Sequence, residues 1–370
     1  MSKKYDFIDF LVYISITTFT LRATFFNTGI LIYLGIFFGL IIFIHKILTN
    51  PVPINITLYI ILIFLIAYFT FINNGFSMGT AFLPHILAGI GISWRIYTNG
   101  INHNFVVILF YVLMANFLYQ TLYLEVTMGS IYSASHNHIS TLFLNLLSLM
   151  AISSYINNKP ISLLPVLLLV FASIISVGNT GIFASLVIFI GYVINKSKNN
   201  KFLILIVFTV LLALFIFETW SYLGEIIVRF YDPNNDMYLK LVKPLPDFLL
   251  NSDRFQIVKL YINDLTPYSL LFGTSLDTSS FLYGQFILKN LHNSFLLLHS
   301  RGGFLSIIVV SVIVLAIIHH LKNNFFLGIC LIAIIVRSIG DTTLFATGAY
   351  DYIFTYLILF NSKKKFTNHR

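Results

Sequence analysis

Long apolar runs recur along almost the whole chain, and this feature restricts the possible folds more than any other. A run of about 20 apolar residues is long enough to cross the hydrocarbon core of a bilayer as a helix. The sequence therefore predicts an all-α fold, a polytopic transmembrane helix bundle with about twelve spans. Ten spans are also acceptable, because the first and last runs are short. The runs lie near residues 7–24, 29–45, 54–72, 80–97, 105–124, 138–156, 161–177, 180–195, 202–220, 293–318, 325–340 and 348–361.

The composition agrees with a lipid environment and excludes a soluble fold. Of the 370 residues, 58% are hydrophobic and only 9% are charged, whereas an ordinary soluble domain has roughly 25% charged residues. So much apolar surface cannot be buried inside one globule of this size. The single cysteine, Cys330, excludes a disulfide framework and a cysteine-based metal site. We expect Cys330 to be a packing residue.

The formal net charge of +9 could indicate a nucleic-acid partner, but the positions of the charges argue against one. If the N-terminus is cytoplasmic, thirteen of the twenty-two Lys and Arg residues fall on the cytoplasmic side, against two acids, Asp6 and Asp9. This is the positive-inside bias of membrane proteins. We therefore expect both termini in the cytoplasm, the lipid bilayer as a partner and no nucleic acid. The thirteen residues are Lys3, Lys4, Lys46, Arg95, Lys159, Lys196, Lys198, Lys201, Lys322, Lys363, Lys364, Lys365 and Arg370.

One connection is far longer than the others. Residues 221–292 separate the ninth and tenth spans on the outer side, and they carry nearly balanced charges. The chain is thus divided into a bundle of about nine spans (1–220), a long loop (221–292) and the C-terminal spans (293–370). Loops of this length are usually either functional or disordered.

The long loop has a sequence typical of ordered structure. Asn251-Ser252-Asp253 predicts a helix N-cap, Arg254–Asp264 predicts an amphipathic helix, and Pro267 predicts its end. We expect short helices that lie at the membrane surface.

Carboxylates are scarce, and no adjacent pair occurs in an early outer loop. Divalent cations prefer such oxygen ligands, so we expect a metal-independent protein with no cofactor. Histidines are few, and the one pair with a spacing that could suggest metal ligands is His136-Asn137-His138. Residues at i and i+2 point in different directions on a helix, so a zinc site there is disfavoured.

The strongest local signal lies where the long loop returns to the membrane. It is His292-Asn293-Ser294, followed by Arg301-Gly302-Gly303. An imidazole at this boundary can titrate near neutral pH and take a proton from a sugar hydroxyl. The alternative is that His292 and Asn293 only cap the following helix. The glycine pair admits close helix packing or a lipid chain, and helix packing is the commoner reason.

Several motifs follow one another in the last third of the chain. After the long outer loop begins, Asp253-Arg254-Phe255 opens a helix, Pro267 precedes Leu271-Phe272-Gly273, and His292-Asn293 precedes Gly303. This order resembles the O-antigen ligase and polymerase superfamily. The first two thirds of the chain are similar to it only in hydropathy and in Ser135-His136-Asn137, which echoes a polar motif at the start of a middle span.

The resemblance implies a GT-C-like helical bundle in the bacterial inner membrane with a periplasmic active site. Its donor would be a glycan on undecaprenyl diphosphate, and a regulator of chain length is a further expected partner. Carried over to this sequence, the resemblance implicates Arg254 and His292 as catalytic residues. The sequence departs from the family pattern at Ser176–Gly181, because many members carry Ser-Arg-Gly there and this chain has no arginine.

The chemistry fits the residues independently of the resemblance. A departing diphosphate needs guanidinium or ammonium groups at the boundary of the outer leaflet. One arginine is expected to have a structural role instead, because Arg337 and Asp341 are spaced i to i+4 and should neutralise each other. Besides Arg254 and His292, the predicted binding residues for the diphosphate and the glycan are Arg229, Arg301, Lys259, Asn293 and His136.

Three functions are compatible with this sequence. The first is a polymerase that joins undecaprenyl-diphosphate-linked repeat units into O-antigen or a related surface polysaccharide. The second is the ligase that transfers the finished chain to lipid A-core in lipopolysaccharide biosynthesis; it ranks lower because of the arginine missing from Ser176–Gly181. The third is a flippase or transporter, which is disfavoured because the chain shows no repeat relating two halves.

Overall fold

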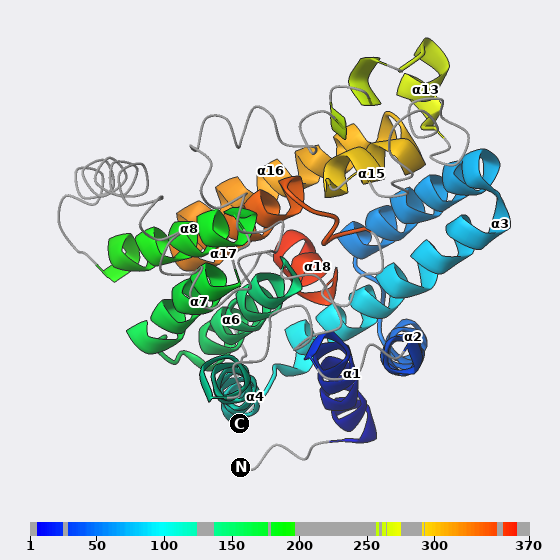
Figure 1. The fold of residues 1–370 in the computed structure, drawn as a ribbon. Coiled ribbons are helices and arrows are strands. Elements are labelled where there is room, and N and C mark those ends of the chain that lie inside the picture. The colour runs from blue at the N-terminus through cyan, green and yellow to red at the C-terminus, as the bar shows by residue number, and fades with distance from the viewer. Residues whose placement is uncertain are drawn as a thin grey trace.

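The computed structural model describes part of the chain. The described residues are 6–24, 29–123, 137–176, 179–196, 257–258, 261–263, 265–274, 291, 293–345 and 351–360. Within them the regular structure is helical throughout, without a strand (Figure 1), so the all-α prediction is confirmed. The helices are α1 (Phe7–Thr24), α2 (Gly29–Thr49), α3 (Ile54–Asn99), α4 (His103–Leu118), the π-helix η1 (Tyr119–Tyr123), α6 (Asn137–Asn157), α7 (Leu163–Ile175), α8 (Asn179–Lys196), α13 (Pro267–Phe272), α15 (Ser294–Gly302), α16 (Leu305–Asn323), α17 (Phe325–Ile339) and α18 (Asp351–Leu359).

Five described helical segments are long and apolar enough to cross a membrane. They are Ile30–Thr49, Ile54–Asn73, His103–Thr121, His138–Asn157 and Leu305–Asn323. Four further apolar helices are shorter, and the run at 202–220 lies outside the described residues. Several long apolar helices identify a membrane protein, whereas a count of twelve spans and a GT-C-like arrangement stay predictions.

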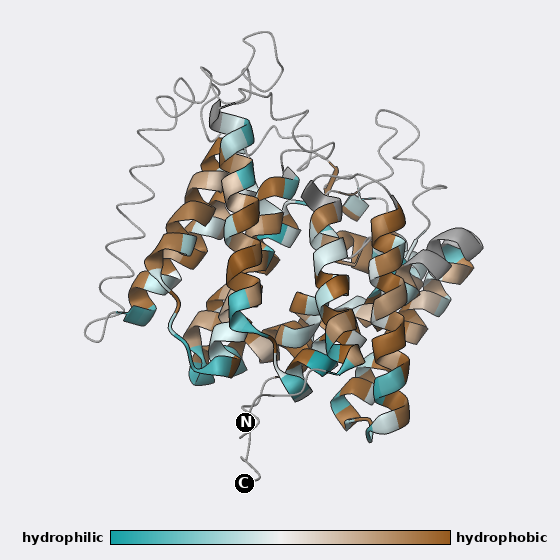
Figure 2. Cartoon of the chain, turned by 90° about the horizontal axis from the view of Figure 1, so that it is seen from below, coloured by the Kyte–Doolittle hydropathy of each residue, from teal (hydrophilic) through white to brown (hydrophobic). Residues whose placement is uncertain are grey.

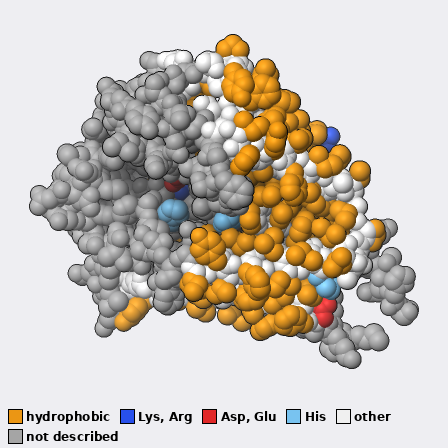
Figure 3. All heavy atoms as spheres, turned by 90° about the vertical axis from the view of Figure 1, so that its right-hand side faces the viewer, with side chains coloured by type: hydrophobic (Ala, Val, Ile, Leu, Met, Phe, Trp, Pro, Cys, Tyr) orange, Lys and Arg blue, Asp and Glu red, His pale blue; other side chains and the backbone are white. Residues whose placement is uncertain are grey.

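Burial separates the lipid-facing helices from the central one. The span in α6 is 89% buried, against 33–39% for the other four, so α6 lies at the centre of the bundle. Large apolar side chains such as Tyr33, Ile54 and Leu315 are exposed. Figure 3 shows a broad hydrophobic surface over the face that includes α2 and α3, and Figure 2 shows that the hydrophilic residues gather towards helix ends. Helices from both sides of the long loop share one hydrophobic core.

Helix α3 contains two of the predicted spans and turns back on itself. Residues 42 positions apart in a straight helix would be separated by about 63 Å. However, the Asn55 side chain donates to the Leu359 carbonyl at 2.7 Å, and the Tyr97 ring stacks on Phe360 with centroids 4.6 Å apart. Both ends of α3 therefore meet the end of α18, and Figure 1 shows the two arms side by side. The predicted runs 54–72 and 80–97 are these two arms.

Contacts between helix ends bring five basic residues to one end of the bundle. The Lys46 ammonium donates to Thr98 at 2.6 Å, Asn157 donates to the Ile101 carbonyl at 3.0 Å, and Tyr192 donates to the Ile161 carbonyl at 3.2 Å. These bonds link the last turns of α2, α3, α6 and α8 with the turns that begin α4 and α7. We call this the lysine-rich end; it carries Lys46, Arg95, Lys159, Lys196 and Lys322.

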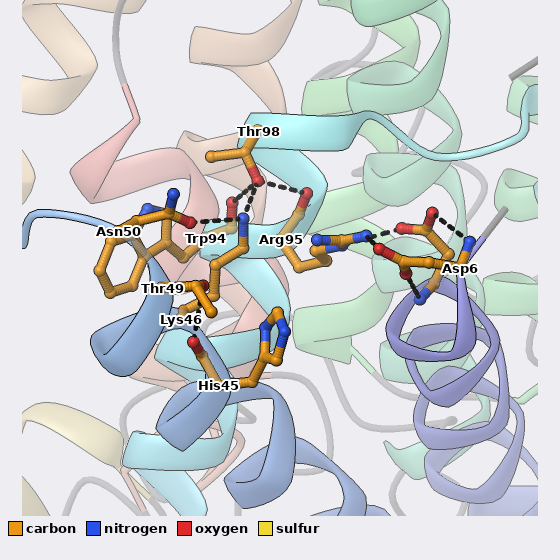
Figure 4. Close-up of polar contacts among 9 residues, drawn as sticks. Asp6, His45, Lys46, Thr49, Asn50, Trp94, Arg95 and Thr98 are labelled. Carbon is orange, nitrogen blue, oxygen red and sulfur yellow. Dashed lines mark hydrogen bonds and ion pairs between the residues drawn. The ribbon is translucent and has the colours of Figure 1, made fainter. Parts of the chain in front are cut away.

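The acids of this end are held by one arginine. The Arg95 guanidinium, buried in the bundle, forms ion pairs with Asp6 at 2.6 Å and with Asp9 at 2.8 Å. Figure 4 shows this arginine between α1 and the last turns of α3, beside Lys46. The ion pairs fasten the start of α1 to the bundle and neutralise both carboxylates.

The predicted span 293–318 is broken in the structure. Helix α15 ends at Gly302 and α16 begins at Leu305, because Gly303 adopts a φ of 51° that a continuing helix does not allow. The described residues 257–258 and 261–263 of the predicted helix Arg254–Asp264 are helical and residues 265–266 are not, so helical structure ends before Pro267, which is itself the first residue of α13. Its neighbour Thr266 caps that helix by accepting from the Ser269 amide at 3.1 Å. Proline is well suited to the first position of a helix because its missing N–H has no partner there.

Candidate functional site

The predicted site residues are only partly within the described residues. Arg301 and Asn293 are described. The catalytic candidates Arg254 and His292, and the binding candidates Arg229, Lys259 and His136, lie outside them. The site is therefore built from the end of the bundle opposite the lysine-rich end, which we call the outer end. It is formed by α13, α15, the last turn of α17 and residues 340–345.

Asn293 and Ser294 fix the start of α15. The Asn293 side-chain oxygen accepts from the Phe295 and Leu296 amides at 2.9 and 3.1 Å, which is the N-cap considered as the alternative role. The buried Ser294 hydroxyl donates to the Asp341 carbonyl at 2.9 Å and accepts from the Thr343 and Leu344 amides, each at 3.0 Å. The cap thus lies against residues 341–344, and His292 is the residue immediately before it in the sequence.

The glycine pair serves close packing. A Cβ on Gly303 would overlap the Leu271 backbone, and one on Gly302 would lie 2.9 Å from the Ile66 Cγ1. The Phe304 amide donates to the Leu271 carbonyl at 3.1 Å, and the Thr274 amide donates to the Ser300 carbonyl at 2.8 Å. Helix α13 of the long loop is therefore bonded directly to the break between α15 and α16.

Arg301 extends from α15 into the bundle. Its guanidinium donates to the Phe345 carbonyl, and its Cζ lies 5.0 Å from the centre of the Phe82 ring. Such stacking favours a desolvated guanidinium. The charge of Asp351 also acts on Arg301, but the described structure does not place the two in an ion pair.

The predicted ion pair between Arg337 and Asp341 is confirmed. Nη2 of Arg337 lies 3.2 Å from the Asp341 carboxylate, while Nη1 donates to the Thr180 hydroxyl at 2.8 Å. Arg337 is only 1% exposed. Thr180 belongs to the Ser176–Gly181 segment, which has no arginine of its own. The structure thus supplies a guanidinium to this segment from α17, a contact that sequence spacing could not reveal.

A tyrosine of the long loop meets a histidine of α15. The Tyr261 hydroxyl lies 2.8 Å from His299 Nδ1, and the His299 ring also hydrogen-bonds to the Leu270 backbone. Burial raises the pKa of the Tyr261 hydroxyl above its usual value, so this group stays protonated beside the imidazole. The two residues are 38 positions apart, so sequence spacing did not reveal the contact.

Asp351 is a second residue that the sequence reasoning did not assign. It begins α18, is 4% exposed, and its Oδ1 has no hydrogen-bond partner among the described residues. An ionisable residue within an apolar run is a functional candidate by default, and this was the available signal. Figure 3 shows acidic, basic and histidine side chains together in a hollow at the boundary with residues that the structure does not describe.

An apolar pocket of about 170 Å³ also lies at the outer end. It is lined by Phe69 and Ile72 of the first arm of α3, and by Tyr268 and Phe272 of α13. Asn73 completes the lining and donates to the Phe272 carbonyl at 2.7 Å. Helix α13 thus covers the end of the first α3 arm.

Within the described ranges, no group of three His, Cys, Asp or Glu side chains is arranged to hold a metal ion. Comparison of the chain with models of known protein families finds no match, and comparison with curated proteins finds none either. The function is therefore inferred from the residues and the geometry alone.

Proposed function

We propose that the protein polymerises undecaprenyl-diphosphate-linked oligosaccharide repeat units into O-antigen or a related surface polysaccharide. The reaction is a glycosyl transfer at the periplasmic face of the bacterial inner membrane. In this assignment the outer end faces the periplasm, and both chain termini lie in the cytoplasm with the lysine-rich end, as the positive-inside bias requires.

One observation carries the proposal: two guanidinium groups are held at the end of the bundle opposite the lysine-rich end. Arg301 and Arg337 both bond to residues of the same short segment, Phe345 and Asp341 respectively. Guanidinium groups fixed in a desolvated environment are suited to stabilise a departing diphosphate. Arginine inside an apolar bundle is costly, which favours a functional reason for each.

The apolar pocket at the same outer end of the bundle supports a lipid-linked donor. Its wall of Phe69, Tyr268 and Phe272 is suited to the isoprenoid chain, while the diphosphate would lie towards Arg301. The contact between Tyr261 and His299 brings the long loop to the same helix. Arg254 and His292 remain the proposed catalytic residues, with Arg254 on the diphosphate and His292 on the acceptor hydroxyl.

The ligase is the second candidate, and a specific contact favours it. The polymerase was ranked above the ligase because Ser176–Gly181 lacks an arginine. Arg337 donates to Thr180 within that segment, so the argument against the ligase is weaker than the sequence indicated. The two activities share their donor and differ in the acceptor.

The test uses full-length protein in liposomes with a lipid-linked repeat unit. We expect a ladder of longer glycans that forms in EDTA, and its loss in Arg254→Ala and in His292→Ala at unchanged protein level. Removing one such contact typically costs ~3–4 kcal/mol of barrier, or roughly two to three orders of magnitude in rate. Arg254→Lys should recover activity only in part, because an ammonium lacks the bidentate fork.

Other outcomes discriminate between the alternatives. Transfer only when lipid A-core is added would identify the ligase. Movement of the lipid-linked unit across the bilayer without new glycosidic bonds would identify a flippase. A normal ladder from His292→Ala would remove that residue from the mechanism, and activity that is lost in EDTA and restored by magnesium would contradict a metal-independent reaction.

A further inference from the structure

A second pocket lies at the lysine-rich end, outside the site proposed above. Its volume is about 240 Å³, and it opens between the last turns of α6 and α8 and the start of α17. Figure 1 shows these helices packed beside α7. We call it the basic pocket; it is lined mainly by Tyr155, Asn158, Lys159, Tyr192, Lys196 and Asn324.

Two lysines stand at the opening of the basic pocket. The Lys159 ammonium is exposed and donates to Asn104 at 3.2 Å, and the Lys196 ammonium lies 5.7 Å from the centre of the Tyr192 ring. An ammonium has three donors, so neither contact uses its full capacity. The acids described at this end, Asp6 and Asp9, are both paired with Arg95. The positive charge of the pocket is therefore not neutralised by any acid of the described structure.

The backbone fixes the position of Lys159 directly after the end of α6. Asn158 adopts a φ of 52°, and the Lys159 amide donates to the Ser154 carbonyl at 2.9 Å. This is the left-handed turn that ends many helices, and here it folds Lys159 back over the last turn of α6. The position of Lys159 is thus set by the fold, in contrast to that of a lysine on a free surface.

Neutral donors and a helix start complete an anion-binding environment. Asn158, Asn195 and Asn324 contribute side-chain amides to the lining. Helix α17, with 15 residues, begins at the pocket, and Phe326 and Leu327 of its first turn are lining residues. The first turn of a helix carries a partial positive charge, although here the Leu327 amide already donates to the Asn324 side-chain oxygen at 3.3 Å. The floor, formed by Ala151, Leu327 and the Tyr192 ring, is largely apolar.

The neighbouring surface is suited to lipid. Helix α7 starts two residues after Ile161 of the pocket lining, and it exposes Leu163, Leu164, Leu167 and Phe171. A molecule in the pocket would thus have charged and amide groups around its polar part and an apolar helix face beside it. Basic pockets between spanning helices on the cytoplasmic side are suited to anionic lipid head groups.

We propose that the basic pocket binds the phosphate of an anionic phospholipid from the adjoining leaflet, with Lys159 and Lys196 as its charged ligands. The site is independent of the glycosyl-transfer proposal, because it lies at the opposite end of the bundle and shares no residue with it. Occupation would join the ends of α6, α8 and α17.

The test is native mass spectrometry of the full-length protein, titrated with phosphatidylglycerol or with phosphatidylethanolamine. We expect phosphatidylglycerol to bind more tightly. A lysine near a membrane surface strengthens attraction to anionic lipid by roughly fivefold, so Lys159→Gln with Lys196→Gln should weaken binding about 30-fold. Lys322→Gln is the matched control, since Lys322 is exposed at the same end but is not part of the lining.

Each outcome of this titration either supports or overturns the proposed lipid site. Equal binding of both lipids, or equal weakening in the control and the double variant, would overturn the proposal. Inorganic phosphate, added as a competitor, distinguishes a lipid from a soluble source: displacement at concentrations similar to those of the lipid would overturn the lipid assignment. The thermal unfolding midpoint of each variant checks its fold. If the double variant does not fold, Lys196→Gln alone should bind about fivefold more weakly.

Discussion

Arg337 performs two roles that have different consequences for mutation. It neutralises Asp341 and it presents a second nitrogen to Thr180. Removing one partner of a buried pair leaves an uncompensated charge, whereas replacing both by apolar residues of similar volume is often tolerated. Single and double substitutions can therefore distinguish a purely structural ion pair from a guanidinium that also binds substrate.

We predict that Asp341→Ala lowers the free energy of unfolding by about 3 kcal/mol or more, because Arg337 is then buried without its carboxylate. The double variant Arg337→Met with Asp341→Leu should recover most of this stability. If Arg337 contributes to diphosphate binding, the double variant stays inactive. Thermal unfolding and the liposome assay measure the two effects separately, and full activity in the double variant would show that the pair is only structural.

Helix α13 is joined to the break between α15 and α16 through backbone atoms. Gly303 allows the close approach of Leu271, the Thr274 amide donates to the Ser300 carbonyl, and the Phe304 amide donates to the Leu271 carbonyl. The position of this short loop helix therefore depends on two glycines with positive φ, Gly273 against the Ser300 carbonyl and Gly303 against Leu271. Gly302, the neighbour of Gly303, packs only against the flexible side chain of Ile66.

The matched pair Gly303→Ala and Gly302→Ala tests this dependence. Gly303→Ala should lower stability by about 2 kcal/mol or more, because alanine is strained at positive φ and its Cβ overlaps the Leu271 backbone. Gly302→Ala should cost less, since the Ile66 side chain can shift. Thermal unfolding of both variants provides the comparison, and an equal loss would mean that crowding, and not backbone conformation, sets the cost.

At this scale the sequence predicted some features and missed others for physical reasons. Hydropathy predicted both arms of α3, because each arm must be apolar along its own length. The break at Gly303 was missed, since a glycine in an apolar run has the same hydropathy whether or not another backbone passes beside it. Spacing predicted the contact of Arg337 with Asp341, which is local along one helix. The contact with Thr180 joins residues 157 positions apart and arises only from packing.

At the scale of the whole molecule, the two ends of the bundle differ in charge and in chemistry. One end gathers lysines and the Arg95 ion pairs, and the other holds Arg301, Arg337 and the loop helix α13. This polarity is a property of the folded bundle, because the residues of each end come from segments throughout the chain. It gives the protein one orientation in a membrane under the positive-inside rule.

We predict that reporters fused at residues 160 and 200 are cytoplasmic, and that those fused at residues 240 and 270 are periplasmic. The reason is the excess of thirteen basic residues over two acids on the connections expected inside. Paired fusions to an enzyme active only in the cytoplasm and to one active only in the periplasm make the measurement. A cytoplasmic result at residue 240 or 270 would contradict both the orientation and the proposed function.

The reversal within α3 has a consequence for how the chain enters the membrane during synthesis. Both ends of this helix lie at the lysine-rich end, and the sequence from Asn73 to Thr80, between its arms, contains no charged residue. Moving a charged side chain to the centre of a bilayer costs about 3 kcal/mol on insertion scales, and this segment avoids that barrier. The two arms can therefore insert together as one hairpin, with Arg95 remaining behind to receive Asp6 and Asp9.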